Sequence, residues 1–389
     1  MLKKNLTLLI LSLMPVSSFA FNGILLTGSG QVSSAMGGVS IGGGLDRASI
    51  ADNPANTGMQ SEGIDGQLVF ALVDSKAKYL GQNSEYKSKQ FVPMPEFAII
   101  KKMNDKVNLG LVTIGSGASL DYGTPPVLGV PSSNAKINLA NATISPTVSY
   151  NIQSNLSVGA SFNLGIQQFR ATGVFAGMDE ENNPIILQSH GNKWAFGTGF
   201  SLGLDYQINS QTTIGASYIS ETRFSKLSGY KEDLLLTSDG QVNLPEKYGI
   251  GIIYKLNDQI TFAADILHIN WEDTDTAGKG KNGLFNWQNQ NVYRTGIDYR
   301  YDSLNSIRFG YSYADKAVMD SDHTIVNFYA NSASHQSITV GYAHIFNFGT
   351  LNLAYEYSLE NSINGRNINT GTDLKNRNHV LTVGLSKKF

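Results

Sequence analysis

The fold is decided by a recurring kind of stretch, of which the clearest example is WAFGTGFSLGLDY at residues 194–206. Starting at Trp194, every second residue is Trp, Phe, Thr, Leu or Tyr, whereas the residues between them are Ala, Gly, Ser or Asp. Successive side chains of a β-strand point to opposite faces. We therefore expect a strand with one bulky apolar face and one small or polar face. The same alternation recurs in IRFGYSY at 307–313 and in LNLAYEY at 351–357.

Short polar turns separate these stretches at regular intervals. They are centred near residues 105, 154, 209, 257, 303 and 348, and longer polar or Gly-rich loops lie between them. Six short turns alternating with seven long loops predict fourteen strands, each of roughly 10–12 residues. An even number of strands with alternating short and long connections is typical of bacterial outer-membrane barrels, in which the short turns are periplasmic and the long loops extracellular. We therefore predict an all-β fold, a 14-stranded antiparallel transmembrane β-barrel.

A secreted β-sandwich is the alternative fold for so many strands. Sandwich strands are shorter, however, and their connections do not alternate strictly between short and long. A closed barrel also satisfies every backbone polar group in lipid, which an open sheet cannot do. The alternation therefore favours the barrel.

The composition agrees with this interpretation. The chain has 389 residues, no cysteine, 40 glycines and 39 aromatic residues, and only 15% of its residues are charged, against roughly 25% in soluble domains. No apolar run past the N-terminus reaches the roughly 18 residues of a transmembrane helix. The missing cysteines exclude a disulfide-stapled domain, a multi-cysteine zinc site and a thiol nucleophile.

The two ends of the chain indicate export and membrane insertion. Lys3 and Lys4 precede a short apolar run and small residues ending at Ala20, which predicts a cleaved signal peptide at 1–20. The last residues, HVLTVGLSKKF at 379–389, alternate and end on an aromatic, as the sorting signals of outer-membrane barrels do. We therefore expect localisation in a Gram-negative outer membrane, contact with its lipid and lipopolysaccharide, insertion by the barrel assembly machinery, and a monomer.

The segment at 21–66 does not alternate and is rich in glycine and small residues. It lacks the Gly-Lys-Ser/Thr sequence of a phosphate-binding loop. A flexible linker is one interpretation; a compact plug packed inside the barrel is the one we prefer, because small residues allow close packing in a lumen. The predicted organisation is a hatch at 21–66 followed by the barrel at 67–389.

Two motifs in this segment, Ala35-Met36-Gly37-Gly38 and Asn53-Pro54-Ala55, resemble the N-terminal hatch of the FadL/TodX family of outer-membrane transporters of hydrophobic compounds. Later stretches at 200–228, 244–271 and 292–315 look similar as well, so the resemblance covers essentially the whole mature chain. It implies a fourteen-stranded barrel closed by a hatch. In that family, substrate caught by the loops passes to a pocket beside the hatch. It then leaves sideways through a gap at a kink in the third strand.

The resemblance also implies candidate site residues. For the hatch and the passage of substrate these are Met36, Gly37, Asn53, Pro54 and Ala55. In the third strand, glycines mark bends or bulges, although each could equally be an ordinary strand-end glycine. The kink candidates are Gly110, Gly115 and Gly117.

Two arginines are predicted to point into the barrel, Arg294 and Arg308. Family members that carry fatty acids meet the carboxylate with basic residues, so these two are possible carboxylate contacts. The other interpretation, which we prefer, is that they neutralise inward carboxylates, because buried charges must be paired. The candidate partners are Asp298, Asp265, Asp205 and Glu356.

The resemblance implies passive uptake of a hydrophobic small molecule, and long-chain fatty acids are favoured because they are the more frequent substrates in the family. Uptake of aromatic hydrocarbons by the same mechanism, or a surface adhesin or receptor that uses the barrel as a platform, are the alternatives. A general diffusion porin would carry more inward charge. We predict no enzyme, no catalytic residue, no metal, no cofactor and no nucleic-acid partner, because the six histidines fall in loops or near strand ends and no basic patch stands out along the chain.

Overall fold

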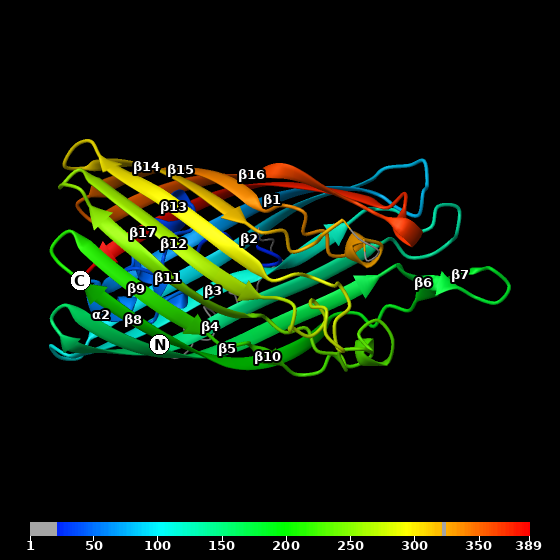
Figure 1. Cartoon of the computed structure of the whole chain (residues 1–389), viewed down its shortest axis with the longest axis horizontal. Coiled ribbons are helices and arrows are strands. Elements are labelled where there is room, and N and C mark those ends of the chain that lie inside the picture. Colours follow the sequence, from blue (N-terminus) through cyan, green and yellow to red (C-terminus); the bar gives the residue numbers. More distant parts are fainter. Residues whose placement is uncertain (1–21, 321–323) are drawn as a thin grey trace, which may run out of the picture.

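A computed structural model describes residues 22–320 and 324–389. Fourteen long strands form a closed antiparallel barrel whose strands are tilted to its long axis (Figure 1). Each strand pairs with its neighbour in the sequence, and the barrel closes because β1 pairs with β17. The predicted fourteen-stranded barrel is therefore confirmed. The signal peptide predicted at 1–20 lies outside the described residues.

The wall consists of the strands β1 (Gly63–Lys78), β2 (Tyr86–Lys102), β3 (Val107–Asp121), β4 (Lys136–Gln153), β5 (Leu156–Thr172), β8 (Lys193–Gln207), β9 (Thr212–Ile219), β11 (Glu246–Lys255), β12 (Ile260–Asn270), β13 (Gln290–Arg300), β14 (Asn305–Ala314), β15 (Gln336–Phe346), β16 (Gly349–Asn364) and β17 (Asp373–Lys388). Smaller elements are the hairpin β6 (Val174–Met178) and β7 (Pro184–Leu187), the two-residue β10 (Arg223–Phe224), the helix α2 (Asn56–Met59) and the 3-10 turns η1 (Ser33–Ala35), η2 (Arg47–Ala51), η3 (Tyr230–Glu232), η4 (Val326–Phe328) and η5 (Asn367–Asn369). No helix in the described ranges is long and apolar enough to cross a membrane.

The strands differ in length, unlike the uniform set that was predicted. Eight of them have 15 to 18 residues, whereas β9 and β11 to β15 have 8 to 11. The long strands continue past the apolar band toward the loops, so the predicted length of 10–12 residues was wrong for them. The first strand begins at Gly63, four residues before the predicted boundary.

The six predicted short turns are all present at one end of the barrel, where the C-terminus also lies (Figure 1). Four of them share one mechanism: an Asn or Asp side chain accepts hydrogen bonds from backbone N–H groups two and three residues later. These residues are Asn104, Asn209, Asn257 and Asp302.

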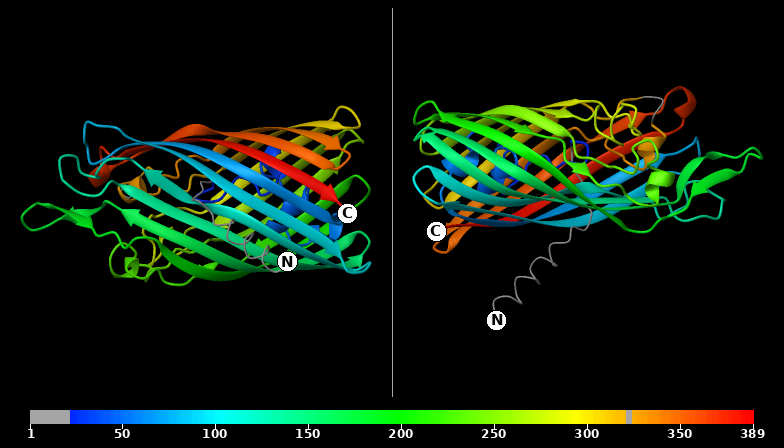
Figure 2. Two further views of the ribbon diagram at one scale, coloured as in Figure 1. Left: turned by 180° about the vertical axis from the view of Figure 1, so that it is seen from behind. Right: turned by 90° about the horizontal axis from the view of Figure 1, so that it is seen from below.

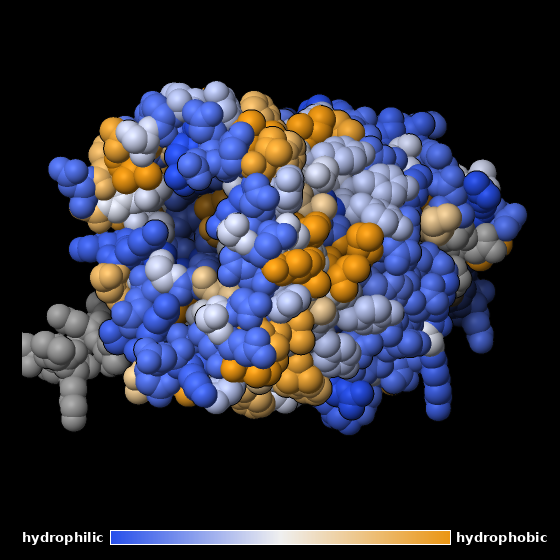
Figure 3. Space-filling view, turned by 60° about the vertical axis from the view of Figure 1, so that its left-hand side comes forward, coloured by the Kyte–Doolittle hydropathy of each residue, from blue (hydrophilic) through white to orange (hydrophobic). Residues whose placement is uncertain are grey.

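The outward side chains form an apolar surface around the middle of the wall. In Figure 3 hydrophobic residues gather in a band between hydrophilic residues at the two ends. On β8 the outward residues include Phe196, which is 66% exposed, whereas the inward residue Ala195 is fully buried. The alternation that predicted the strands is therefore the alternation between the lipid face and the lumen.

The N-terminal segment, residues 22–62, lies inside the barrel (Figure 2). Inward glycines of the wall make room for it, because a Cβ atom added at any of them would lie within 2.7 Å of an atom of this segment. Small wall residues thus let the two backbones approach closely. These glycines are Gly159, Gly203, Gly215, Gly251, Gly296, Gly310, Gly341 and Gly384.

Charged side chains hold the N-terminal segment on the wall. The Arg47 guanidinium forms a buried ion pair with Asp65 of β1 at 2.7 Å and donates to the Ser386 hydroxyl of β17 at 3.0 Å. On the opposite wall, Asp265 accepts hydrogen bonds from two backbone N–H groups of the segment, and Asp205 accepts one. The segment is therefore fastened on both sides of the lumen.

Replacing Arg47 with methionine should destabilise the protein by about 3–5 kcal/mol, because it leaves the buried carboxylate of Asp65 without its cation. The free energy of unfolding, measured by urea titration in detergent micelles, checks this. Arg223→Met is the matched control, since the Arg223–Glu221 pair is exposed on the arginine side and contributes at most about 1 kcal/mol. Equal losses in the two variants would contradict the assigned role of Arg47.

A second prediction concerns pH. Burial, assisted by the nearby carboxylate of Asp65, raises the pKa of Asp46 to about 7. Its side chain accepts hydrogen bonds from the backbone N–H groups of Val32 and Ser49. An acid whose pKa is raised in the folded state stabilises that state below its unfolded pKa, and this contribution is lost as pH rises through about 7. We expect a lower thermal midpoint at pH 8 than at pH 5, and a flatter dependence in Asp46→Asn. An unchanged slope in that variant would contradict the assignment.

Candidate functional site

The barrel wall is interrupted between β2 and β3. Toward the short-turn end the two strands pair from Lys102 with Asn108 to Phe97 with Thr113. Beyond this point β3 continues to Asp121 in register with β4 alone. The half of β3 nearer the long loops, after Thr113, therefore has a partner strand on only one side.

In this part of β3, three backbone donors bond to the N-terminal segment or to side chains of β2 instead of the β2 backbone. The N–H of Gly117 donates to the carbonyl oxygen of Ile24 in the N-terminal segment at 3.0 Å. The N–H of Asp121 donates to the Ser88 hydroxyl at 2.9 Å, and that of Gly115 lies 3.5 Å from the Glu96 carboxylate. Where β3 is not paired with the β2 backbone, it is therefore hydrogen-bonded to the N-terminal segment in the lumen through Ile24.

The three glycines predicted as kink candidates lie in different parts of β3. Gly110 pairs with Ile100 of β2 in the regular part of the ladder. Gly115 and Gly117 lie in the part without β2. Gly117 has a φ of +151°, a conformation that other residues rarely adopt.

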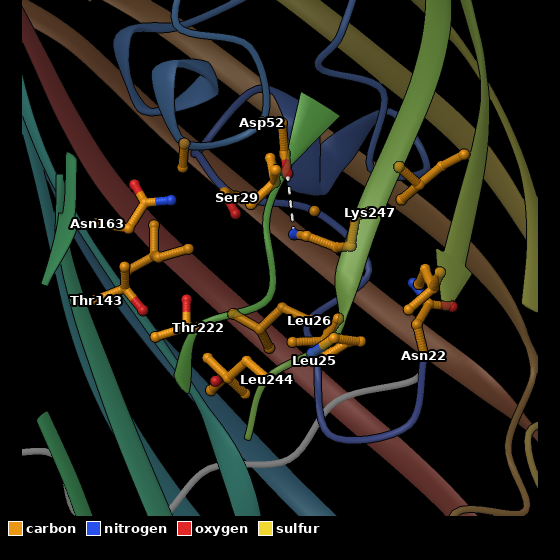
Figure 4. A pocket seen from close by; sticks show the side chains of 18 of the residues that line it. Asn22, Leu25, Leu26, Ser29, Asp52, Thr143, Asn163, Thr222, Leu244 and Lys247 are labelled. Atoms are coloured by element: carbon orange, nitrogen blue, oxygen red, sulfur yellow. Dashed lines mark ion pairs between the residues drawn. The ribbon is translucent and has the colours of Figure 1, made fainter. Parts of the chain in front are cut away.

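A partly open cavity, of about 770 Å³ including open solvent, lies beside the unpaired part of β3; we call it the inner cavity. It is bounded by the N-terminal segment on one side and by wall strands on the other. In Figure 4, Asp52 and Lys247 face each other at one end of the inner cavity, whereas Leu25, Leu26 and Leu244 gather at the other. The side of the cavity toward the interruption is formed by Ile114, Gly115 and Ser116.

Three charged side chains line the inner cavity: Asp52, Lys247 and Arg294. The ammonium of Lys247 lies 3.8 Å from the carboxylate of Asp52. Arg294 also lines the cavity and donates to the carbonyl oxygen of Gly38 at 3.0 Å. Arg308 does not line it; its guanidinium is bound by Asp298 at 2.8 Å and by Asn352 at 2.7 Å. Arg308 thus forms the lumen ion pair, and Arg294 reaches the cavity.

Two apolar spaces lie between the inner cavity and the loops. The chamber, of about 550 Å³ including open solvent, is surrounded by apolar side chains of the wall and the loops, among them Leu139, Phe169, Leu235, Trp271 and Trp287. The outer pocket, of about 980 Å³ including open solvent, is bounded by loop residues and by the β6–β7 hairpin, among them Val174, Phe175, Leu187, Leu284 and Ile325.

The three spaces follow one another along the lumen. The outer pocket and the chamber share Ile137, Leu234, Phe285 and Tyr329, so they are adjacent. Ile24 lines the chamber and the next residues of the chain line the inner cavity. The start of the N-terminal segment therefore separates the apolar chamber from the inner cavity.

Packed aromatic rings fill the rest of the loop end. Phe328 of η4 is stacked between Tyr79 and Tyr122, with ring centroids 3.9 and 4.5 Å away. Burial raises the pKa of Tyr79 and of Tyr329, so both phenols remain protonated hydrogen-bond donors. Tyr329 donates to the carbonyl oxygen of Gly173 and accepts from the N–H of Phe175, which fixes η4 over the outer pocket.

The residues predicted for the hatch and the passage of substrate lie where the N-terminal segment contacts the wall. The side chain of Asn53 donates to the carbonyl oxygen of Ile41 at 2.7 Å and to the carboxylate of Asp205 at 3.2 Å. Met36 is fully buried, and the N–H of Gly37 donates to the Thr339 hydroxyl at 2.9 Å.

Pro54 and Ala55 pack against the wall glycines Gly159 and Gly203. None of the five predicted residues is among those lining the three spaces. Their contacts are docking contacts, and a role in the passage of substrate stays a prediction.

Sequence reasoning missed most residues that line the three spaces. The chamber depends on aromatic residues such as Trp271, Phe285 and Trp287, which lie in loops without periodicity. One indication of their role is present in the sequence: these large aromatic residues lie in loop segments that are otherwise polar. The cavity residues Leu25 and Lys247 carried no signal at all.

Neither a metal site nor a nucleophile elbow is formed by the candidate residues in the described part of the chain. They contain no group of three or more His, Cys, Asp or Glu that could hold a metal ion. Gly199-Phe200-Ser201-Leu202-Gly203 has the Gly-x-Ser-x-Gly spacing of a nucleophile elbow, which requires a sharp strand-to-helix turn. Here it lies within β8, and the Ser201 hydroxyl accepts from the Asn163 amide at 2.8 Å.

Comparison with known proteins gives a family and several structural neighbours. The family model for outer membrane protein transport protein (OMPP1/FadL/TodX) matches residues 9–342. The toluene transporter TodX of Pseudomonas putida superposes with a TM-score of 0.71 at 20% identity, over 93% of this chain and 99% of that chain.

A FadL homologue of Pseudomonas aeruginosa gives a TM-score of 0.70 at 13% identity, over 94% and 100% of the two chains. The toluene transporter TbuX of Ralstonia pickettii superposes with a TM-score of 0.64 at 19% identity, over 95% of this chain and 100% of that chain. At such identities these neighbours establish the fold. No curated protein matches the chain.

Gly117→Ala tests the conformation of the unpaired strand. A Cβ atom there would lie 2.1 Å from the backbone oxygen of Leu139, and its φ is unfavourable for alanine, so we expect a loss of about 1–3 kcal/mol in unfolding free energy. The contact with Ile24 should weaken, which faster proteolysis of the N-terminal segment would report. Gly66→Ala is the control, because nothing lies within 4 Å of its added Cβ. The assignment fails if both variants behave like the parent.

Proposed function

The chain belongs to the OMPP1/FadL/TodX family of outer-membrane transport proteins, and we propose that its hydrophobic substrate enters through the loops and leaves sideways between β2 and β3. Family membership places the protein in the outer membrane of Gram-negative bacteria as a transporter of hydrophobic compounds, in a family of transport channels rather than enzymes. One observation supports the lateral route: the outer pocket, the chamber and the inner cavity lead in succession to the part of β3 that lacks β2.

In this proposal the N-terminal segment acts as the hatch. It is fastened to the wall by Arg47 and by the inward aspartates, and its residues separate the apolar chamber from the inner cavity. A substrate that reaches the inner cavity meets the hatch below it and the unpaired strand beside it. The sideways path into lipid would not require the hatch to move.

The driving force for such transport is the transfer of apolar surface, about 25 cal/mol per Å² removed from water. A molecule in the chamber has already lost most of its contact with water, because the chamber is lined almost entirely by apolar side chains. Moving it from the chamber into the hydrocarbon of the bilayer changes little in free energy. Uptake is therefore passive and needs no coupled energy source.

We propose an uncharged hydrophobic molecule as the preferred substrate. Neither the chamber nor the outer pocket has a Lys or Arg among its lining residues. An isolated carboxylate in such surroundings costs several kcal/mol. The neighbours TodX and TbuX are toluene transporters, which agrees with an uncharged substrate. The long-chain fatty acids expected from the sequence are the second candidate, because Arg294 in the inner cavity could meet a carboxylate.

Tryptophan fluorescence separates the two substrate classes. Trp271 and Trp287 line the chamber, whereas Trp194 points outward and is 40% exposed. Purified Trp194→Phe protein should change its emission when an aromatic hydrocarbon or a long-chain alcohol binds. The matching fatty acid should bind roughly tenfold more weakly at neutral pH. Preferential binding of the fatty acid, lost in Arg294→Gln, would instead assign the protein to fatty acids.

The lateral route is tested by Gly115→Leu. A leucine side chain at this position would project toward Met94 and fill the space at the opening, since the added Cβ already lies 3.3 Å from the Met94 side chain. Uptake by cells or vesicles should fall on the order of tenfold, while binding in the chamber persists. Gly66→Leu is the control on β1. An adhesin or receptor would lose function with the β6–β7 hairpin and be indifferent to Gly115.

A further inference from the structure

The loop end of the barrel carries a row of three lysines on its outer face. Lys76 of β1 lies directly opposite Lys87 of β2 and directly opposite Lys375 of β17. These three strands lie side by side in the wall, at the seam where the chain closes on itself (Figure 2). The row faces outward, because the neighbouring residues Ser75 and Ala77 of β1 are buried in the lumen.

This arrangement is unfavourable within the protein alone. Residues directly opposite each other in neighbouring strands have Cβ atoms about 4.5–5.5 Å apart, and like charges at such positions are destabilising. Lys87 has a single ion pair, with the exposed Glu85 of the loop that precedes β2, at 3.2 Å. Within residues 22–320 and 324–389, Lys76 and Lys375 form none. The mature chain is net negative, so the row is a local concentration of positive charge.

The neighbouring rows show where the lysines lie in the membrane. Four residues nearer the middle of the wall, Leu72 of β1 lies opposite Phe91 of β2, and both are exposed apolar residues. Between these rows lies Asp74, which pairs with Arg377 at 2.8 Å. Four residues span about 14 Å of strand, and the tilt of the strands shortens this height. The lysine row therefore lies in the head-group layer just outside the hydrocarbon.

We propose that the row Lys87–Lys76–Lys375 is a binding site for the phosphate groups of lipopolysaccharide in the outer leaflet. A phosphate at this position would lie among three ammonium groups that have too few partners in the chain. The acyl chains of the same molecule would lie over the exposed apolar face of Phe91 and Leu72. The bound glycolipid thus supplies the negative charge that the row lacks, and this site does not depend on which substrate is transported.

The triple variant Lys76→Gln, Lys87→Gln, Lys375→Gln tests the site. Native mass spectrometry of the purified protein with bisphosphorylated lipid A should show a roughly hundredfold weaker complex than the parent, since each lysine near an anionic lipid surface contributes about fivefold. The control, Lys106→Gln, Lys255→Gln, Lys388→Gln, removes the same charge at the short-turn end and should bind like the parent. Unchanged binding by the first variant would overturn the proposal.

The choice of ligand is tested separately on the parent protein. Dephosphorylated lipid A should bind about as weakly as the bisphosphorylated form binds to the triple variant. Phosphatidylglycerol or inorganic phosphate binding as tightly as bisphosphorylated lipid A would overturn the assignment to lipopolysaccharide.

A stability measurement distinguishes a ligand site from a merely structural role. Without lipopolysaccharide, Lys76→Gln should raise the thermal midpoint in detergent, because it removes the repulsion at the centre of the row. With saturating lipopolysaccharide the same variant should have a lower midpoint than the parent, because it binds the stabilising ligand less tightly. A shift of the same sign in both conditions would overturn the proposal.

Discussion

The structure depends on the rule that backbone N–H and C=O groups facing hydrocarbon must be paired within the chain. Fourteen strands closed through β1 and β17 obey this rule around nearly the whole wall. The interruption between β2 and β3 is compatible with it only because Ile24, Ser88 and Glu96 supply acceptors to the donors released on β3. An opening in the wall and a filled lumen are therefore two aspects of one arrangement. Without the N-terminal segment, the N–H of Gly117 would lose its acceptor.

The same dependence explains the division of residue types in the wall. Outward positions are bulky and apolar because they contact lipid, and many inward positions are glycine because a second backbone lies against them. Where the wall is not glycine, it carries carboxylates such as Asp205 and Asp265 that accept hydrogen bonds from that backbone. Low charge, abundant glycine and abundant aromatics thus have one cause. The apolar chamber lies on the loop side of this polar contact, where aromatic side chains replace glycine.

The strand number could be predicted from the sequence because alternation and turn spacing are local properties. The strand lengths could not, since the continuation of β1 or β4 beyond the apolar band depends on pairing with neighbours. Gly115 and Gly117 could be selected as residues of the third strand, but the sequence did not distinguish them from Gly110, which lies in the paired part of the ladder. The chamber escaped prediction because its residues come from several loops. The lysine row escaped it because cross-strand register brings together residues that are far apart in the chain.

Arg47 has a consequence for how the protein is assembled. Its guanidinium contacts Asp65 on the first strand and Ser386 on the last, which are themselves register partners at the seam of the barrel. This three-residue cluster can form only when the N-terminal segment is in place and the first and last strands have met. Closing the barrel and seating the segment are therefore linked equilibria, in which each event makes the other more favourable. A barrel that closed without the N-terminal segment would lack the contacts of Arg47 with both seam strands and would be less stable for that reason.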